Sequence, residues 1–379
     1  MQGPSTVVHV ATVSEPARAL LRNKRHFRIM CVPPLIPQNP YQRLLYRALA
    51  ERGFELLPES TLHIHRLLRL RARAGIVHIH WPQSCYRHDG PSVLSWLKLL
   101  IFVLRLAAAR VLGYRIVWTV HQVLPHEVRS QRLDHAASVA LADLSNVLVV
   151  HDRKTADDVA KLLPRNTSKL RVVPHGSYVG VYPPGRARAD VRAELGVTAD
   201  ACVFLSFGHL RAYKDVDVLL DAFGLVQSRS TALVIAGLPL DHSLTTRLET
   251  AAILDERIRI LPRFIPEDGV SELFGAADVA VLPRGDGGTS GALILALSLG
   301  LPVIAARTQT AVDLTEADGA AWWFQPGDSR DLAAVIENVS RDPENRIAKQ
   351  HGARAAAERL SWSQAAELLD PVLLREDAR

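Results

Sequence analysis

Short apolar runs alternate with longer segments whose apolar residues recur every three or four positions. The runs predict buried strands, and the longer segments predict helices that pack against them. Strands are expected at residues 27–32, 55–57, 76–79, 115–121, 146–150, 170–173, 201–207, 232–236, 259–261, 279–282 and 301–306. Helices are expected at residues 41–52, 92–113, 152–163, 216–227 and 291–299. The alternation predicts an α/β protein whose parallel sheets carry helices on both faces.

The stretch at 277–306, ADVAVLPRGDGGTSGALILALSLGLPVIAA, predicts a strand, a Gly-rich loop, a helix and a second strand. Thr289 or Ser290 would cap the helix, and Gly291 lets backbone N–H groups approach a ligand. A helix N-terminus with free N–H donors and a positive dipole suits a phosphate. The same three residues would equally serve as a plain cap on a core helix, so this stretch alone leaves both interpretations open.

A second turn of the same kind follows the strand at 201–207, with the sequence GHLRAYKD. Gly208 allows a sharp exit from the strand, and Arg211 and Lys214 follow at the carboxyl edge of the sheet, where cations reach bound phosphate. Alone, these charges would more often be solvated. Two such turns on neighbouring strands would suit a diphosphate.

Histidines mark the strand ends of the first half. His78 lies in the strand at 76–79 and is expected to be a hydrogen-bonded core residue, and Trp81 just beyond could pack or support a sugar ring. His121 ends the strand at 115–121, with His126 and Glu127 soon after. A histidine beyond a strand's carboxyl end is placed to take or share a proton near neutral pH.

Charge is divided unevenly along the 379 residues, which are enough for two domains. Residues 1–115 hold 17 Lys and Arg against 5 Asp and Glu, about +12, and the remainder is near −6. A basic half is expected to face an anionic partner. Nucleic acid is disfavoured because the basic residues are not interleaved with aromatic ones, which make up only 6% of the chain. An anionic membrane surface or a phosphorylated lipid fits better.

The most lipophilic segment is 92–113, which Lys98, Arg105 and Arg110 interrupt. Because no run of 18 uncharged apolar residues occurs, no segment is an obvious membrane span. The segment could lie in a membrane interface with its basic groups reaching outward, or be an ordinary crossover helix on the sheet. The cysteines, Cys31, Cys85 and Cys202, lie far apart in sequence and are expected to be reduced thiols.

Four regions are expected along the chain. Residues 1–25 lack a signal-peptide core and predict a loose extension, and residues 26–180 predict the first domain. Residues 174–188 are rich in Gly and Pro and predict a linker to a second domain at 181–360. Residues 361–379 predict a C-terminal helix that packs back toward the first domain.

The chain resembles the GT-B glycosyltransferases of the GT4-like kind. The resemblance rests on WTVHQVLPHE at 118–127, VVPHGSY at 172–178, FGHLRAYKDVDVLLDAF at 207–223 and the stretch at 277–306. It implies two Rossmann-like, doubly wound domains that face each other across a cleft. The C-terminal domain would bind a nucleotide-sugar, and the N-terminal domain would bind the acceptor, with His121 near the reacting carbon.

The chain departs from that family at one motif. Most relatives carry two glutamates eight residues apart around this helix, and the matching positions here are Gly287 and Leu295. The resemblance is therefore to a subgroup that uses a TSG turn. It implies diphosphate binding by Gly208, Arg211, Lys214, Thr289, Ser290 and Gly291, and nucleoside binding by Arg263, Phe264, Ile265 and Asp286. It further implies acceptor binding by Asn39, Tyr41, Trp81 and His126.

The expected function is transfer of a mannose- or glucose-type hexose from GDP-mannose or a UDP-sugar to a lipid-linked or polysaccharide acceptor in bacterial glycan synthesis. No paired acidic motif precedes the Gly-rich loop, so Arg and Lys are expected to replace a divalent metal, and no cofactor is expected. The enzyme is expected in the cytoplasm or at the inner face of the plasma membrane, without nucleic acid.

Two other functions stay open at this level, a nucleotide-sugar epimerase of the same fold and a non-catalytic partner subunit. The stereochemistry is open as well. If the reaction inverts, His121 or Glu127 would act as base toward the acceptor hydroxyl. If it retains, His121 would hold the donor sugar.

Overall fold

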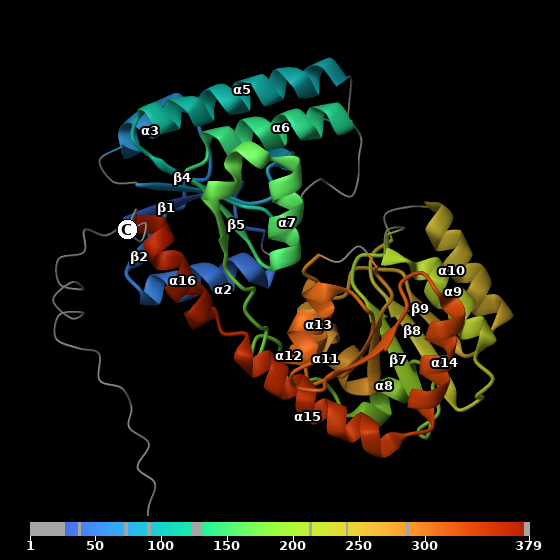
Figure 1. The fold of residues 1–379 in the computed structure, drawn as a ribbon. Helices are drawn as coiled ribbons and strands as arrows, with labels where there is room; N and C mark the ends of the chain where they lie inside the picture. Colours follow the sequence, from blue (N-terminus) through green and yellow to red (C-terminus); the bar gives the residue numbers. More distant parts are fainter. Residues whose placement is uncertain are drawn as a thin grey trace, which may run out of the picture.

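The computed structural model of the protein describes residues 27–36, 39–71, 75–88, 92–122, 130–211, 214–239, 242–285 and 288–374. Within these residues the chain forms two α/β domains, and the last helices run from the second domain back to the first (Figure 1). The expected extension at 1–25, together with His126, Glu127, Asp286 and Gly287, lies outside the described residues.

The described residues of the N-terminal domain form a six-stranded, parallel sheet in the order β2-β1-β3-β4-β5-β6. Alternate residues of β1 point to opposite faces, so Met30 and Val32 enter one core and Ile29 and Cys31 enter the other. The strands are β1 (Phe27–Val32), β2 (Phe54–Leu56), β3 (Ile76–Ile79), β4 (Arg115–Thr119), β5 (Val147–Val150) and β6 (Leu170–Val172).

Helices cover both faces of this sheet. Helices α3, α5, α6 and α7 pack on one face, and α2 packs on the other beside the C-terminal helix α16 (Figure 1). The helices of this domain are α2 (Pro40–Glu51), α3 (Ile64–Leu70), α4 (Gln83–Tyr86), α5 (Ser92–Val111), α6 (Gln131–Leu144), α7 (Arg153–Leu162) and the 3-10 helix η1 (Pro164–Lys169).

Among the described helices, α5 alone is long and apolar enough to cross a membrane, judged by length and composition. Leu99, Phe102 and Leu106 of α5 are buried in the domain core. Only 28% of its most apolar window is buried inside the protein. The helix therefore packs on the domain as a crossover helix should, and it still exposes much apolar surface.

The described part of the C-terminal domain holds a second six-stranded parallel sheet, in the order β12-β11-β10-β7-β8-β9. Strands β7 and β10 are neighbours, with Val279 opposite Phe204. The strands are β7 (Cys202–Phe207), β8 (Thr231–Ala236), β9 (Ile258–Leu261), β10 (Val279–Leu282), β11 (Val303–Ala306) and β12 (Ala321–Phe324). Since the chain order reverses direction at β7 and β10, this sheet is doubly wound, as the sequence predicted.

The second sheet also lies between two helix layers. Helices α11, α12 and α15 bury their apolar side chains on one face, and α9, α10 and α14 on the other. The helices are α8 (Arg188–Glu194), α9 (Val216–Leu225), α10 (His242–Leu254), α11 (Glu267–Ala276), α12 (Gly291–Ser298), α13 (Gln309–Thr315), α14 (Ser329–Ser340), α15 (Pro343–Arg359) and α16 (Trp362–Leu374).

Helix α16 fastens the end of the chain to the N-terminal domain. Its Asp370 carboxylate pairs with Arg52 at 2.9 Å, and the Val372 carbonyl accepts a 2.8 Å hydrogen bond from Arg115 Nε. The indole of Trp362 packs so tightly on Gly176 that a Cβ there would lie 2.3 Å from the ring. The linker between the domains is thereby held against the last helix.

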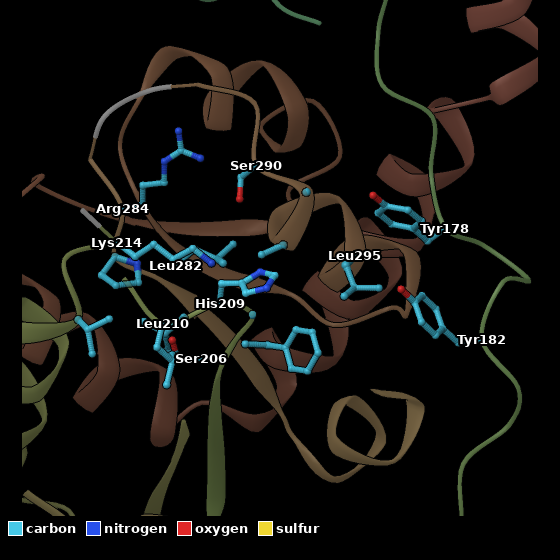
Figure 2. A pocket seen from close by; sticks show the side chains of 17 residues that line it. Tyr178, Tyr182, Ser206, His209, Leu210, Lys214, Leu282, Arg284, Ser290 and Leu295 are labelled. Atoms are coloured by element: carbon cyan, nitrogen blue, oxygen red, sulfur yellow. The ribbon is translucent and has the colours of Figure 1, made fainter. Parts of the chain in front are cut away.

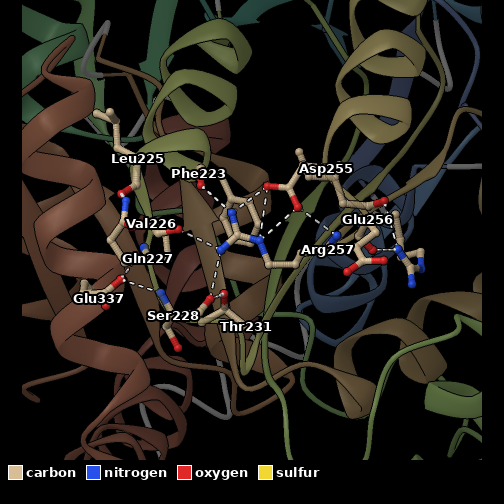
Figure 3. A network of polar contacts seen from close by, with 12 residues as sticks. Phe223, Leu225, Val226, Gln227, Ser228, Thr231, Asp255, Glu256, Arg257 and Glu337 are labelled. Atoms are coloured by element: carbon tan, nitrogen blue, oxygen red, sulfur yellow. Dashed lines mark hydrogen bonds and ion pairs between the residues drawn. The ribbon is translucent and has the colours of Figure 1, made fainter.

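An arginine network closes the amino end of the second sheet (Figure 3). Arg257, next to β9, pairs with Asp255 at 2.6 Å and donates to the carbonyls of Val226 and Ser228 at 2.8 and 2.9 Å. Side-chain N–H groups that donate hydrogen bonds to loop carbonyl oxygens stabilise a fold. We therefore assign a structural role to this end of the sheet, opposite the carboxyl ends where ligands bind in such folds.

Candidate active site

A cavity of about 320 Å³ lies at the carboxyl ends of β7 and β10. In Figure 2 the side chains of Lys214, Arg284 and Ser290 surround one part of it, and Tyr178 and Tyr182 lie at the other. Asp215 joins the loops that follow the two strands, because its Oδ2 accepts a 3.0 Å hydrogen bond from the Gly285 N–H. The two turns singled out in the sequence thus border one cavity.

Lys214 lies directly over the glycine that ends β7. Gly208 has φ +110°, and a Cβ at this position would lie 3.2 Å from Lys214 Nζ. Burial first, and then Arg284 and Arg211, lower the pKa of Lys214 to about 8. Like charges that depress one another in a concave site would be stabilised by an anion bound between them. The cavity is therefore suited to a phosphate group.

The amino end of α12 forms another wall of the cavity. Ser290 caps this helix, and its Oγ accepts a 3.3 Å hydrogen bond from Leu293 N–H. Gly291 follows with no side chain, and the hydroxyl of Tyr178 lies 3.8 Å from where its Cβ would be. The first N–H groups of a helix have no partner within it and attract negative charge.

Thr289 faces the other domain. Its backbone N–H donates to Asp152 Oδ2 at 3.2 Å, and its hydroxyl donates to the same oxygen. Burial alone would raise the pKa of Asp152, but the hydrogen bonds from Thr289 and Thr155 lower it below its usual value. In this conformation the donors of Thr289 bridge the two domains and are not among the groups that line the cavity.

Other residues expected to bind the donor lie outside the cavity lining. The Arg211 guanidinium contributes charge beside Lys214, and the Arg211 backbone carbonyl accepts a 3.0 Å hydrogen bond from the Lys214 N–H. Arg263, Phe264 and Ile265 follow β9, two strands from β7, at the edge of the sheet. The Phe264 side chain is exposed and that of Ile265 packs in the core. Nucleoside binding by this turn, mainly through its backbone, stays a prediction.

Tyr178, Tyr182 and Arg284 are among the cavity residues that sequence reasoning missed. Tyr178 ends the motif VVPHGSY at 172–178, but nothing in the sequence indicated that the linker would fold under α12. Arg284 is the basic residue in the Gly-rich loop, and that charge in a loop with a predicted anion site was the available signal.

The carboxyl edge of the N-terminal sheet carries a histidine near the end of each of four neighbouring strands. His78 and His80 lie in and just after β3, and His121, His151 and His175 follow β4, β5 and β6. Four of them, all but His78, gather around the buried ring of Tyr41, and His78 lies against the ring of Tyr46. Ring centroids within 4.9–6.0 Å of Tyr41 belong to His80, Trp81, His121, His151, His175 and Trp362.

Hydrogen bonds join three of these histidines in series. Thr119 Oγ1 lies 2.8 Å from His78 Nε2, and the Tyr46 hydroxyl lies 3.0 Å from His78 Nδ1. The same hydroxyl lies 3.1 Å from His80 Nε2, and His80 Nδ1 lies 3.0 Å from His121 Nε2. The expectation of a hydrogen-bonded core position for His78 is confirmed, since its side chain is fully buried.

These histidines are uncharged at neutral pH. Burial, and then His151 and His175, keep the pKa of His121 well below its usual value, and burial with His151 lowers that of His78 to about 3. Burial removes the hydration that stabilises an imidazolium. His151 Nδ1 donates to the Val173 carbonyl at 2.9 Å, and its buried Nε2 has no partner among the described residues.

Asn39 and Trp81, expected to bind an acceptor, have defined contacts. Asn39 caps α2, and its Oδ1 accepts a 3.1 Å hydrogen bond from Tyr41 N–H. Trp81 stacks on the ring of His121 with centroids 4.1 Å apart. Its φ of 40° is unusual for a residue with a side chain, and such backbone strain persists where the surrounding structure holds it.

The two domains bring these groups together at their interface. Tyr178 lines the cavity, and its hydroxyl lies 3.4 Å from His175 Nε2. His175 in turn contacts Tyr41, whose ring lies 4.9 Å from that of His121. The cavity of one domain and the histidines of the other are thus linked by a continuous series of contacts. Among the described residues, no group of three His, Cys, Asp or Glu side chains could hold a metal ion.

Residues 201–342 match the family described as Glycosyl transferases group 1. A GDP-mannose:glycolipid 4-beta-D-mannosyltransferase of Xanthomonas campestris pv. campestris is 30% identical over 312 residues, which cover 80% of this chain and 81% of that protein. A D-inositol 3-phosphate glycosyltransferase of Saccharomonospora viridis is 29% identical over 256 residues, 64% of this chain and 58% of that protein.

Solved structures share the architecture. HepE of Anabaena, crystallised with UDP and glucose, superimposes with a TM-score of 0.72 at 16% identity, over 92% of this chain and 100% of that one. WaaG, a glycosyltransferase of lipopolysaccharide biosynthesis, gives a TM-score of 0.66 at 15% identity, over 92% and 99% of the two chains. With two parallel sheets and a mannosyltransferase relative along four fifths of its length, the chain belongs to the group 1 glycosyltransferases of GT-B fold.

Proposed function

We propose that this enzyme transfers a mannose- or glucose-type hexose from a nucleoside diphosphate sugar to a lipid-linked or polysaccharide acceptor. The observation that carries the proposal is the cavity where Lys214 and Arg284 meet the capped amino end of α12. The name of the Xanthomonas campestris relative gives GDP-mannose as donor and a glycolipid as acceptor. Both substrates suit a chain with an anion-binding cavity beside a buried cluster of aromatic and histidine side chains.

Catalysis in this proposal is mainly electrostatic. Cleavage of the bond between sugar and phosphate leaves its electron pair on the diphosphate, and the Lys214 ammonium and the α12 N–H groups stabilise that charge. These donors are held before the substrate arrives, so little reorganisation is needed. We propose that they replace a divalent metal ion and that no cofactor takes part. His121, half-buried beyond β4, acts as base toward the acceptor hydroxyl in an inverting reaction.

A transfer assay tests the proposal. Purified enzyme is incubated with GDP-mannose or UDP-glucose and a polyprenyl-linked glycan, and sugar transfer is measured. Lys214→Ala is expected to abolish transfer while the circular dichroism spectrum stays unchanged. Lys349→Ala is the matched control, because Lys349 lies in the same domain over the ring of Trp322. Equal transfer by wild type and Lys214→Ala would refute the diphosphate site.

We further propose that the N-terminal domain binds an anionic bilayer at the cytoplasmic face through an apolar patch on α3 and α5. Trp96 and Leu97, Leu100 and Leu104 follow one another at intervals of three or four residues along α5, and their side chains are 44–59% exposed. The patch consists of Ile64, Leu68, Val93, Trp96, Leu97, Leu100 and Leu104. Arg66, Arg69, Lys98 and Arg105 on the same two helices supply complementary charge.

Liposome sedimentation tests this surface. Wild type is expected to sediment with vesicles that contain phosphatidylglycerol and to stay in solution with phosphatidylcholine alone. Leu100→Glu with Leu104→Glu should abolish binding. Ile253→Glu with Leu254→Glu in α10 is the control, because these residues are 83% and 80% exposed in the other domain. Binding that ignores lipid charge, or equal effects of the two double variants, would contradict the proposal.

A further inference from the structure

The hydrogen-bonded series of the N-terminal domain runs from the core outward and ends at His121. It starts at a hydroxyl in the core, Thr119, passes through His78, Tyr46 and His80, and ends at His121, the one member that is not fully buried. Among the described residues, none hydrogen-bonds the remaining ring nitrogen of His121, Nδ1. A buried polar series with one outer end suggests that the outer end has a partner in the working enzyme.

The number of protons restricts how the series can be arranged. Each neutral imidazole carries one N–H, so His80 donates on one side and accepts on the other. The Tyr46 hydroxyl has a single proton and can donate to His78 or to His80, but not to both. Whenever Tyr46 does not donate to His80, His80 donates Nε2–H to Tyr46 and accepts at Nδ1. His121 must then donate its own Nε2–H, which leaves Nδ1 as a bare lone pair.

This arrangement favours a base at His121. Each group of the series then donates its hydrogen bond to the next group toward the core, starting from His121, and each hydrogen bond polarises the next. Electron density is thereby drawn toward His121, so a positive charge that develops on its ring is better stabilised than in the reverse arrangement. This opposes the effect of burial, which lowers the pKa of His121. In the reverse arrangement the N–H of His121 would point outward and the ring could only donate. A second residue that fixes the tautomer of a histidine commonly raises its basicity.

We propose that His80 and Tyr46 are positioning residues that hold His121 as the Nε2–H tautomer, with Nδ1 ready to accept the proton of the acceptor hydroxyl. This rests on the proposed hexosyl transfer. The acceptor oxygen forms its bond to the anomeric carbon as its proton passes to Nδ1. The bond from that carbon to the diphosphate oxygen breaks, and its electron pair leaves with the nucleoside diphosphate. His121 then releases the proton to solvent.

Trp81 fixes the orientation of the His121 ring on which this assignment depends. Its ring is stacked on His121 with an interplanar angle of 12°, so the imidazole cannot rotate about its own bond without losing that contact. The pairing of His121 Nε2 with His80 is therefore fixed in orientation. Nδ1 stays on the side of the ring that is away from His80.

The test compares two tyrosine-to-phenylalanine variants in the same domain. Tyr46→Phe removes the hydroxyl that joins His78 to His80. Tyr114→Phe is the matched control, because its buried hydroxyl donates to the Leu67 carbonyl at 2.7 Å and lies at the amino end of β4. His80→Asn is the conservative variant, because the asparagine side-chain oxygen can accept the hydrogen bond from His121 near the position of Nδ1. His80→Leu cannot accept this hydrogen bond.

Tyr46→Phe is expected to lower kcat about ten-fold with KM within about two-fold, as loss of an outer partner of an active histidine does. Tyr114→Phe should leave kcat within about two-fold of wild type, and His80→Asn should retain more of kcat than His80→Leu. Equal kcat for the two phenylalanine variants would overturn the proposal.

Nitrogen-15 NMR of histidine-labelled protein gives a readout that does not depend on transfer. The His121 signals, assigned by their loss in His121→Asn, are expected to show a protonated Nε2 and an unprotonated Nδ1 in wild type. A protonated Nδ1 would overturn the proposal even if transfer is confirmed. If wild type transfers no sugar while Nδ1 is unprotonated, the proposed function fails and the tautomer assignment stands.

Discussion

If Lys214 binds the donor diphosphate as proposed, its lowered pKa should make donor binding depend on pH. In the unliganded protein, burial and the neighbouring Arg284 and Arg211 lower the pKa of Lys214 to about 8. A bound diphosphate opposes these effects because it favours the charged ammonium. The complex therefore has a higher Lys214 pKa than the free enzyme. Binding is strongest below pH 8 and weakens as the pH rises through the pKa of the free enzyme.

The magnitude follows from the charged fraction of Lys214. With a pKa of about 8, roughly nine tenths of the free enzyme carries the ammonium at pH 7 and roughly one tenth at pH 9. If the complex stays charged over this range, the Kd rises about ten-fold between the two pH values. Proton uptake on binding rises from about 0.1 to about 0.9 per site.

Isothermal titration calorimetry with GDP-mannose measures both quantities, because the observed heat varies with the ionisation enthalpy of the buffer when protons are taken up. The diphosphate diester of this sugar nucleotide does not titrate between pH 7 and 9. Lys214→Arg is the control, since a guanidinium stays charged and should remove the pH dependence. An unchanged wild-type Kd across this range, or the same slope in Lys214→Arg, would refute the reasoning.

Three further outcomes are expected. Asp152→Asn weakens the bridge to Thr289 and should cost about 1–2 kcal/mol of stability at pH 7. Because those hydrogen bonds lower the pKa of Asp152, their contribution is present above its usual pKa and is lost as the pH falls through the lowered pKa, so the urea stabilities of the two proteins should converge in acid. Gly176→Ala forces a Cβ into the Trp362 ring and should cost about 1–3 kcal/mol, whereas Gly75→Ala, with nothing within 4 Å, should be nearly neutral in thermal unfolding. EDTA treatment should leave the transfer rate within about two-fold, and a loss that Mg²⁺ restores would contradict charge stabilisation by protein groups alone.

Local pattern was enough to predict most strands. The ranges 27–32, 76–79 and 279–282 agree with β1, β3 and β10, because a short apolar run between breakers has few other solutions. Strand β12 was not predicted, since its two tryptophans carry no clear alternation. Helices α13 and α14 were not predicted either.

The candidate site was less accessible to sequence reasoning. Lys214 and Ser290 were singled out by turn chemistry, and both line the cavity. Thr289, one residue away, instead meets Asp152 from the other domain, a contact between residues 137 positions apart. No local rule distinguishes these neighbours, because the distinction depends on how the two domains face each other.

By itself the sequence determined the α/β class and the two basic or Gly-rich turns, since periodicity and turn residues act over a few positions. The doubly wound arrangement was implied by the family resemblance. Tertiary structure alone decided that four strand ends bring four histidines around Tyr41 and that α16 places Trp362 on Gly176. Burial of those histidines, and hence their neutral state, arises from contacts between distant segments. The physical reason is that desolvation depends on everything packed around a group, which a linear pattern does not contain.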